Sequence, residues 1–279
     1  MKKIIYLIFL CFSFSFAQVQ TPQPSPLQKN EVIIGLTNFS LEYSRPSMRG
    51  RTIFGELVPY GALWRTGANK NTIITFDDSV IIGGKEINSG SYSIYTRPSE
   101  KSWDVIFYNK IDNSGLPNKW EKSMESLVLN VKTKKTEKKV ETFDIWFSNL
   151  HNDGASLNFA WENTHISILI KVPTKTKVIS SINKTLSDSP KAGDYFNAAR
   201  YHLQENIDLN KAEFWIGKSL DMQETFWGYR QQALIFEKLG EIDNAIDSAK
   251  KSINLAEKEG NKDYVLMNNN SISKWISNK

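Results

Sequence analysis

Hydrophobic and polar residues alternate with a period of two along the first two thirds of the chain. Apolar side chains occupy every second position in segments 39–43, 103–107, 127–131, 143–147, 157–161 and 166–172. Turn sequences at 83–84, 88–90, 113–115 and 153–154 fall between them. Because successive side chains of a strand point to opposite faces, each segment predicts a strand with one buried face. About nine or ten short strands at this spacing predict an antiparallel β-sandwich or jelly roll over residues 31–173.

After residue 190 the period changes to 3.6, the period of amphipathic helices. Two successive faces consist of Ala192, Tyr195, Phe196, Ala199 and Leu203, and of Leu209, Ala212, Trp215, Ile216 and Leu220. Residues 227–258 resemble a tetratricopeptide repeat through the alanines Ala233, Ala245 and Ala249 and the turn residues Leu239 and Gly240. We therefore expect a short tetratricopeptide-like helical domain over 190–279. Its last helix, at 262–276, contains three consecutive asparagines at 268–270 that disfavour helix.

The first 17 residues predict an export signal, because two lysines precede an apolar run that ends before Ala17. The run is too short to span a membrane, so we expect no transmembrane segment after cleavage and a periplasmic or extracellular protein. Residues 18–30 hold three prolines and predict an extended, loosely ordered leader, while the polar residues 174–189 predict a linker. Cleavage would also remove Cys11, the one cysteine, and leave a mature chain without disulfides.

Residues 43–76 combine arginine, aromatic and glycine residues at high density. Four of the seven arginines of the chain lie here. A guanidinium group binds carboxylates and phosphates through paired hydrogen bonds and stacks on aromatic rings. One interpretation is a pocket for an anionic or sugar-like small ligand, whose candidate residues are Arg45, Arg51, Tyr60, Trp64, Arg65 and Asn69. The other is structural, with arginines that satisfy the carbonyl groups of a long loop.

The same stretch is part of a resemblance to a known family, which covers about residues 31–173. Its motifs are Ser44-Arg45-Pro46, Gly50-Arg51, Pro59-Tyr60-Gly61, Trp64-Arg65 and Gly67-Ala68-Asn69, with the blocks IIGGKEINSGSYSIYTRP and WDVIFYNK behind them. In these motifs the chain resembles a secreted bacterial family known as domain of unknown function 2911. The resemblance implies a fold and a compartment but no activity. Lys70 and Asn71 depart from it, since an acidic and then a small residue are expected there.

Several kinds of chemistry find no support in the sequence. His151 and His165 lack partners at metal-ligand spacing, so we expect no metal and no cofactor. No serine stands in a nucleophile elbow, and no glycine loop of the phosphate-binding type is present. The net charge of +5 is dispersed, which argues against a nucleic-acid partner. The local basic run at 132–139 predicts a solvated hairpin tip, and residues 117–125 predict a short surface helix with Pro117 near its first turn.

Three hypotheses follow from these observations. The first is a non-catalytic, exported binding or scaffold protein, with a ligand pocket on the β domain, no catalytic residue, and a protein or peptide partner at the helical repeats. The second is an envelope enzyme acting on a glycan or anionic substrate, in which Arg51 and Arg65 stabilise charge and Glu56 transfers protons. In the third, the arginine-rich loop is purely structural and the function belongs to the helices, although so few repeats could also serve only to stabilise the sandwich.

Overall fold

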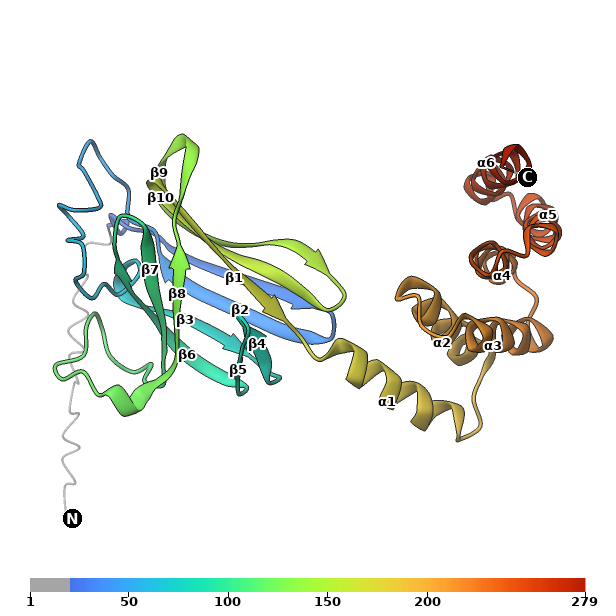
Figure 1. Ribbon diagram of the computed structural model, residues 1–279, viewed down its shortest axis with the longest axis horizontal. Coiled ribbons are helices and arrows are strands. Elements are labelled where there is room, and N and C mark those ends of the chain that lie inside the picture. The colour runs from blue at the N-terminus through green and yellow to red at the C-terminus, as the bar shows by residue number, and fades with distance from the viewer. Residues whose placement is uncertain (1–20, 279) are drawn as a thin grey trace, which may run out of the picture. The chain divides into compact units, whose positions relative to one another are not determined.

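The structure is a computed structural model that describes residues 21–278. The chain divides into two units, one ending at Thr174 and the other beginning at Lys175. The predicted export signal and the first residues of the predicted leader lie outside the described residues. Within the described part, the first unit is built of strands and the second of helices (Figure 1). No helix between residues 21 and 278 combines the length and the apolar character needed to cross a membrane.

Two antiparallel sheets form the first unit. The strands are β1 (Leu27–Ile34), β2 (Thr37–Ser44), β3 (Ala68–Phe76), β4 (Val80–Ile82), β5 (Lys85–Ile87), β6 (Gly90–Pro98), β7 (Ser102–Tyr108), β8 (Glu125–Lys132), β9 (Lys134–His151) and β10 (Gly154–Lys171). One sheet has the order β1-β2-β3-β6-β7-β8, and the other has the order β5-β4-β10-β9. The predicted β-sandwich is thereby confirmed.

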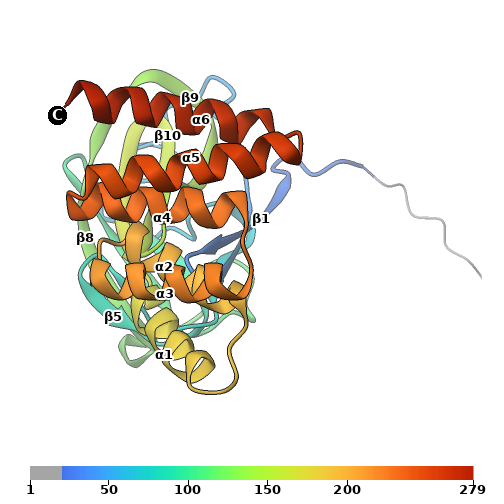
Figure 2. The same ribbon diagram turned by 90° about the vertical axis from the view of Figure 1, so that its right-hand side faces the viewer.

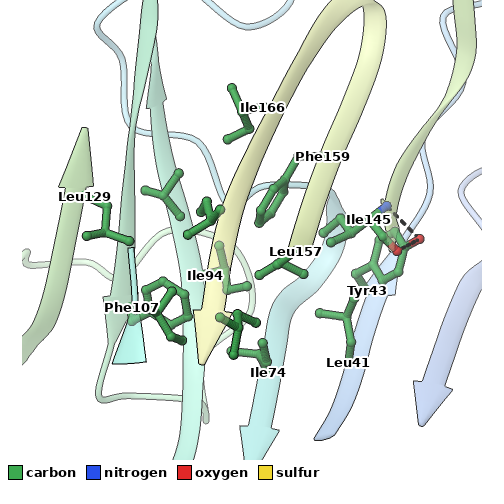
Figure 3. Close-up of a cluster of buried hydrophobic side chains, with 14 of the residues drawn as sticks. Leu41, Tyr43, Ile74, Ile94, Phe107, Leu129, Ile145, Leu157, Phe159 and Ile166 are labelled. Carbon is green, nitrogen blue, oxygen red and sulfur yellow. Dashed lines mark hydrogen bonds between the residues drawn. The ribbon is translucent and has the colours of Figure 1, made fainter. Parts of the chain in front are cut away.

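The core lies between the two sheets, where the apolar face of each alternating strand is buried (Figure 3). Leu41 and Phe107 of the larger sheet and Leu157 of the smaller one are almost fully inaccessible to solvent. One polar group joins the sheets through this core. The Tyr43 hydroxyl lies 2.9 Å from both the backbone carbonyl oxygen and the backbone nitrogen of Ile145. Burial raises the pKa of Tyr43, so this hydroxyl stays protonated.

A bulge in β10 explains why the sequence suggested two strands there. The residues of β10 that belong to the core between the sheets have odd numbers up to Trp161 and even numbers from Ile166 onward. The pairing of β10 with β9 shifts on both sides of Glu162, which has a positive φ of 54°. An irregular residue of this kind reverses which positions face the core. The segments 157–161 and 166–172 therefore belong to one continuous strand that ends at Lys171.

Two local predictions in this unit were wrong. The basic run at 132–139 is not a hairpin tip, because Thr133 alone connects β8 to β9 and the following lysines pair with β10. The run is polar on both faces, so it shows no alternation that could reveal a strand. The surface helix expected near residues 117–125 is reduced to the short 3-10 helix Lys122–Met124, and Trp120 just before it stacks on Tyr108 of β7.

Six helices follow the strands in the described part of the chain. They are α1 (Thr174–Leu186), α2 (Ala192–Gln204), α3 (Leu209–Met222), α4 (Phe226–Leu239), α5 (Ile242–Lys258) and α6 (Lys262–Ser277). Helices α2 and α3 form one hairpin and α4 and α5 the next, while α4, α5 and α6 lie side by side in Figure 2. The starts of α2, α4 and α6 are 34 and 36 residues apart (226 − 192 and 262 − 226), which matches the tetratricopeptide period.

Small residues let the paired helices approach closely, as predicted. Ala199, Ala212, Ala233, Ala245 and Ala249 are all fully buried at these contacts. The predicted turn after Leu239 is also confirmed, since Gly240 ends α4 with a φ of 83° that suits glycine. The helical unit is thus a short tetratricopeptide-like stack.

Asn268, which seemed unfavourable for the last helix, is fully buried there. Its amide nitrogen donates to Ser252 Oγ of α5 at 2.8 Å, and its oxygen accepts from Arg230 Nη1 of α4 at 3.1 Å. These bonds join three helices, and they offset the poor helix propensity of asparagine. Sequence propensity missed this because the compensation is tertiary.

The predicted linker at 174–189 contains a helix instead of an irregular segment. Val178, Ile179, Ile182 and Leu186 recur at helical spacing in α1, and the polar composition of the segment concealed this apolar stripe. The predicted leader is also shorter than expected, because β1 begins at Leu27 and pairs with β2 along its whole length.

Candidate functional site

Arg45 joins three segments of the β unit. Its Nε donates to the carbonyl of Phe143 at 3.1 Å, its Nη1 donates to Gln28 Oε1 at 2.6 Å, and its Nη2 lies 3.1 Å from Asp144 Oδ1. The side chain retains about a quarter of its exposure. The guanidinium group therefore binds the edge strand β1 to β9 and leaves no nitrogen without a protein acceptor.

The segment before β1 is held by the same region. Arg49 Nη2 donates to the carbonyl of Pro24 at 2.8 Å, and Asn69 Nδ2 donates to the carbonyl of Ser25 at 3.1 Å. The backbone N–H of Arg45 donates to the carbonyl of Pro26 at 2.9 Å. We expected residues 24–26 to be loosely ordered, but they are fixed because the arginine-rich loop supplies donors for proline-rich backbone that has few donors of its own.

Arg51 closes a turn of its own loop. Its Nε donates to the carbonyl of Met48 at 2.9 Å, and its Nη2 donates to the carbonyl of Ser47 at 2.8 Å. Gly50, with a φ of 75°, makes the turn that brings the side chain back onto these carbonyl groups. Arg51 thus has different partners from Arg45.

Trp64 packs inside an aromatic cluster. Its ring centroid lies 5.0 Å from that of Phe143, 5.7 Å from Trp161, 6.1 Å from Trp103 and 6.3 Å from Phe54. Its indole N–H donates to the carbonyl of Gly67 at 3.1 Å. Trp161 stacks on the ring and the other three neighbours meet it edge-on, so Trp64 is packed against the core.

Arg65 and Asn69 meet at the loop between β7 and the 3-10 helix Lys122–Met124. Arg65 Nη1 donates to the carbonyl of Asn69 at 3.4 Å, a long bond at an exposed position. The guanidinium group also lies against Gly115, where a Cβ atom would come within 2.9 Å of Nη1. Ser114 Oγ donates to the same carbonyl of Asn69 at 3.4 Å. This contact is the weakest of the arginine contacts in the stretch.

A buried polar cluster lies beside this contact, although little in the sequence indicated it. Asn71 Nδ2 lies 3.1 Å from Ser93 Oγ, 3.1 Å from the Tyr95 hydroxyl and 3.0 Å from Asn113 Oδ1. Asn71 Oδ1 is buried and has no partner among the described residues. Burial raises the pKa of Tyr95, although hydrogen bonds from Asn113 and Asn71 oppose the rise. Two signals in the sequence could have indicated this cluster. Asn71 departs from the family motif, and Asn113 lies in a turn sequence.

Tyr60 lies apart from the other candidates. Its side chain is 44% exposed and lines a hollow of about 530 Å³ with Lys101, Lys134, Lys135 and Asn163. Burial, followed by the charges of Glu100 and Glu162, raises the pKa of Tyr60, so the hydroxyl is protonated at neutral pH. The six candidate residues therefore do not surround one pocket. Arg45 and Asn69 both bond to the segment before β1, and Arg65 contacts Asn69 at the loop that follows β7. Trp64 packs against the core.

The residues named for other chemistry are also separated. Glu56 is exposed in the turn that precedes Val58 and has no hydrogen bond or ion pair within residues 21–278. His151 pairs with the adjacent Asp153, whereas His165 stacks on Trp146 with ring centroids 5.7 Å apart. Across the described part of the chain, no three His, Cys, Asp or Glu side chains cluster as a metal site would require.

Fold and site together define a class of protein: an antiparallel β-sandwich with an arginine-braced loop, continued by tetratricopeptide-like hairpins. The chain belongs to the family described as Protein of unknown function (DUF2911), which matches residues 25–170. No curated protein matches the sequence. Among solved structures, "Crystal structure of MamA" is similar at 16% identity and a TM-score of 0.28, covering 38% of this chain and 68% of that chain.

Proposed function

We propose that the protein is an exported, non-catalytic binding protein of the cell envelope. In this proposal the β-sandwich is the scaffold, its arginine-rich loop is structural, and the helical unit binds a protein partner. The observation that carries the proposal is the use of the arginines. All four guanidinium groups of residues 43–76 donate to acceptors of the chain itself. The guanidinium nitrogens of Arg45 and two of those of Arg51 are thereby engaged, so these donors are not free for an anion pocket or an oxyanion-stabilising site.

The helical unit supplies a surface of the kind that binds proteins. Phe214 and Met222 of α3 are 60% and 57% exposed, and they share one helix face with Lys218 between them. The Lys218 ammonium lies 5.6 Å from the centroid of the Phe214 ring. An exposed aromatic and methionine side chain beside a cation resembles the composition of interface centres, where aromatic residues and methionine are enriched. We refer to Phe214, Lys218 and Met222 as the α3 stripe.

The test is photo-crosslinking in the cells that produce the protein. A photoreactive phenylalanine analogue is placed at position 214, or as a matched control at Ile276, which is 59% exposed on α6 of the same unit. The proposal expects a discrete protein adduct from position 214 that the additional change Met222→Ser weakens, and none from position 276. Absence of an adduct at 214, or identical adducts from both positions, contradicts it.

Export is tested separately by fractionation. The chain with its first 17 residues is expected outside the cytoplasm and shortened by the mass of the signal, whereas a chain lacking them is expected in the cytoplasm. A full-length chain that remains cytoplasmic contradicts this part of the proposal.

A further inference from the structure

Two features that lie about 75 residues apart in the sequence meet at one hollow of the β unit. Tyr60 comes from the arginine-rich loop, and Lys134 and Lys135 come from the basic run at the start of β9. Lys101 of the β6–β7 turn and Asn163 of the β10 bulge complete the walls of this hollow of about 530 Å³. We call it the Tyr60 hollow. None of the arginines takes part in it.

Backbone hydrogen bonds hold the segments around the hollow in place. The N–H of Gly61, next to Tyr60, donates to the carbonyl of Pro98 at 2.8 Å. The N–H of Thr133 donates to the carbonyl of Lys101 at 3.0 Å, and its hydroxyl donates to the carbonyl of Glu100 at 2.8 Å. The aromatic wall and the basic wall are therefore both bonded to the end of the β6–β7 hairpin. A site held this way requires little ordering when a ligand binds.

The irregular backbone at Glu162 fixes the third wall. Its carboxylate accepts the N–H groups of Ile53 and Phe54 at 3.2 and 3.3 Å, which ties the bulge of β10 to the loop that leads to Tyr60. Glu162 has a φ of 54°, a conformation that a residue without glycine's freedom rarely adopts. Left-handed residues of this kind cluster at binding sites, where the surrounding structure compensates for their cost. Asn163 and Thr164 follow directly and line the hollow.

The polar groups of the hollow are available to a ligand. Within the described residues, the ammonium groups of Lys101, Lys134 and Lys135 form no ion pair, and the Tyr60 hydroxyl and the Asn163 amide form no hydrogen bond. This contrasts with the arginines, which are engaged with the chain's own acceptors. Three positive charges around an exposed aromatic ring favour an anion with an apolar face.

From these contacts we infer that the Tyr60 hollow binds an acidic saccharide, a sugar chain that carries carboxylate groups. The Tyr60 ring offers a face for the C–H side of a sugar ring, and the lysines offer point charges for its carboxylates. The Glu100 carboxylate, the Asn163 amide and the Thr164 hydroxyl suit sugar hydroxyl groups, which both donate and accept. This site is independent of the partner proposed for the α3 stripe.

The experiment is calorimetric titration of the mature full chain with tetragalacturonic acid, at neutral pH and low salt. The double variant Lys134→Gln/Lys135→Gln and the single variant Tyr60→Ala are each expected to weaken binding roughly tenfold or more. The matched control is Lys138→Gln/Lys139→Gln, which removes the same charge from exposed positions of the same strand outside the lining. Its affinity is expected to stay within about twofold of the wild type.

Further probes separate the ligand classes. Maltotetraose has the sugar rings without the charge, and tetraglutamate and a four-nucleotide single-stranded DNA have charge without the acidic sugar. All three are expected to bind at least roughly tenfold more weakly than tetragalacturonic acid. Undetectable binding of tetragalacturonic acid, equal losses in the test and control lysine pairs, or tighter binding of the peptide or DNA would each overturn the inference. The thermal unfolding of every variant is measured beside the titrations. The inference is judged from the variants whose midpoint of thermal unfolding is unchanged.

Discussion

Tyr60 and Trp64 are four residues apart in one loop, but the loop places them in opposite environments. On its inner side, Trp64 and Arg45 contact the core and β9, and their polar atoms are bonded within the chain. On its outer side, Tyr60 is exposed beside unpaired lysines, and Arg65 makes one long bond. A high density of arginine and aromatic residues therefore marked two different roles. The inner side braces the fold, and the outer side leaves groups free for a ligand.

The largest effect expected from this comparison is on stability. Trp64→Ala removes a ring that contacts four aromatic neighbours and should lower the free energy of unfolding by about 3 kcal/mol. Tyr60→Ala should change it by less than about 0.5 kcal/mol, because the ring is exposed. Urea unfolding followed by circular dichroism measures both. Equal losses in the two variants would show that the inner and outer sides do not differ.

The arginines give the second contrast. Arg45→Ala removes bonds to Gln28 and Phe143 and leaves Asp144 without its guanidinium partner, so we expect a loss of about 2 kcal/mol. Arg65→Ala breaks one exposed bond of 3.4 Å and should cost less than about 1 kcal/mol.

Hydrogen exchange distinguishes a local effect from a global one. In Arg45→Ala the amides of β1 should lose protection more than those of β7, since Arg45 connects Gln28 of β1 to Phe143 and Asp144 of β9. A larger stability loss in Arg65→Ala than in Arg45→Ala would refute the assignment of Arg45 as the main brace.

The features that could be predicted from the sequence are those that depend on the local period of hydrophobic and polar residues. Alternation identified β2, β7, β8, β9 and both parts of β10, and alanines such as Ala233 and Ala249 marked the helix contacts. The sequence could not reveal that Trp64 turns inward while Tyr60 turns outward, because both are aromatic residues beside glycines and their environment depends on distant strands. Nor could it bring Lys134 to Tyr60, since the basic run lacks alternation and its pairing with β10 is set by the bulge at Glu162. The buried role of Asn268 was likewise tertiary.

The helical unit also contains a buried polar side chain without hydrogen bonds among the described residues. His202 of α2 is 4% exposed, and neither ring nitrogen has a partner among the described residues. Its ring contacts Trp215 of α3 edge-on, with centroids 4.7 Å apart. Burying polar atoms without partners costs free energy, so His202→Leu should stabilise the unit by about 1 kcal/mol.

Denaturant unfolding of the full chain, with hydrogen exchange at α2 and α3, measures this gain. His202→Gln is the matched control, because it keeps polar atoms at the same place and should give no gain. A loss of stability in His202→Leu would mean that the imidazole fits its site better than the unpaired nitrogens suggest.

The smallest expected effect concerns His165, which lies on the pairing register opposite Lys134 at the edge of the Tyr60 hollow. Burial, and then the charge of Lys134, lower the pKa of His165 below its ordinary value of 6.5. The folded chain therefore binds this proton less readily than the unfolded chain does. The contribution of His165 to the free energy of unfolding is constant at pH values above its unfolded pKa. As the pH drops through 6.5 toward the lower pKa of the folded chain, this contribution is lost and stability falls. His165→Gln should flatten this part of the stability profile, and Lys134→Gln should raise the pKa of His165 in an NMR titration. An unchanged pKa of His165 in Lys134→Gln would show that Lys134 of the hollow does not affect the histidine. Burial would then be the cause of the lowered pKa.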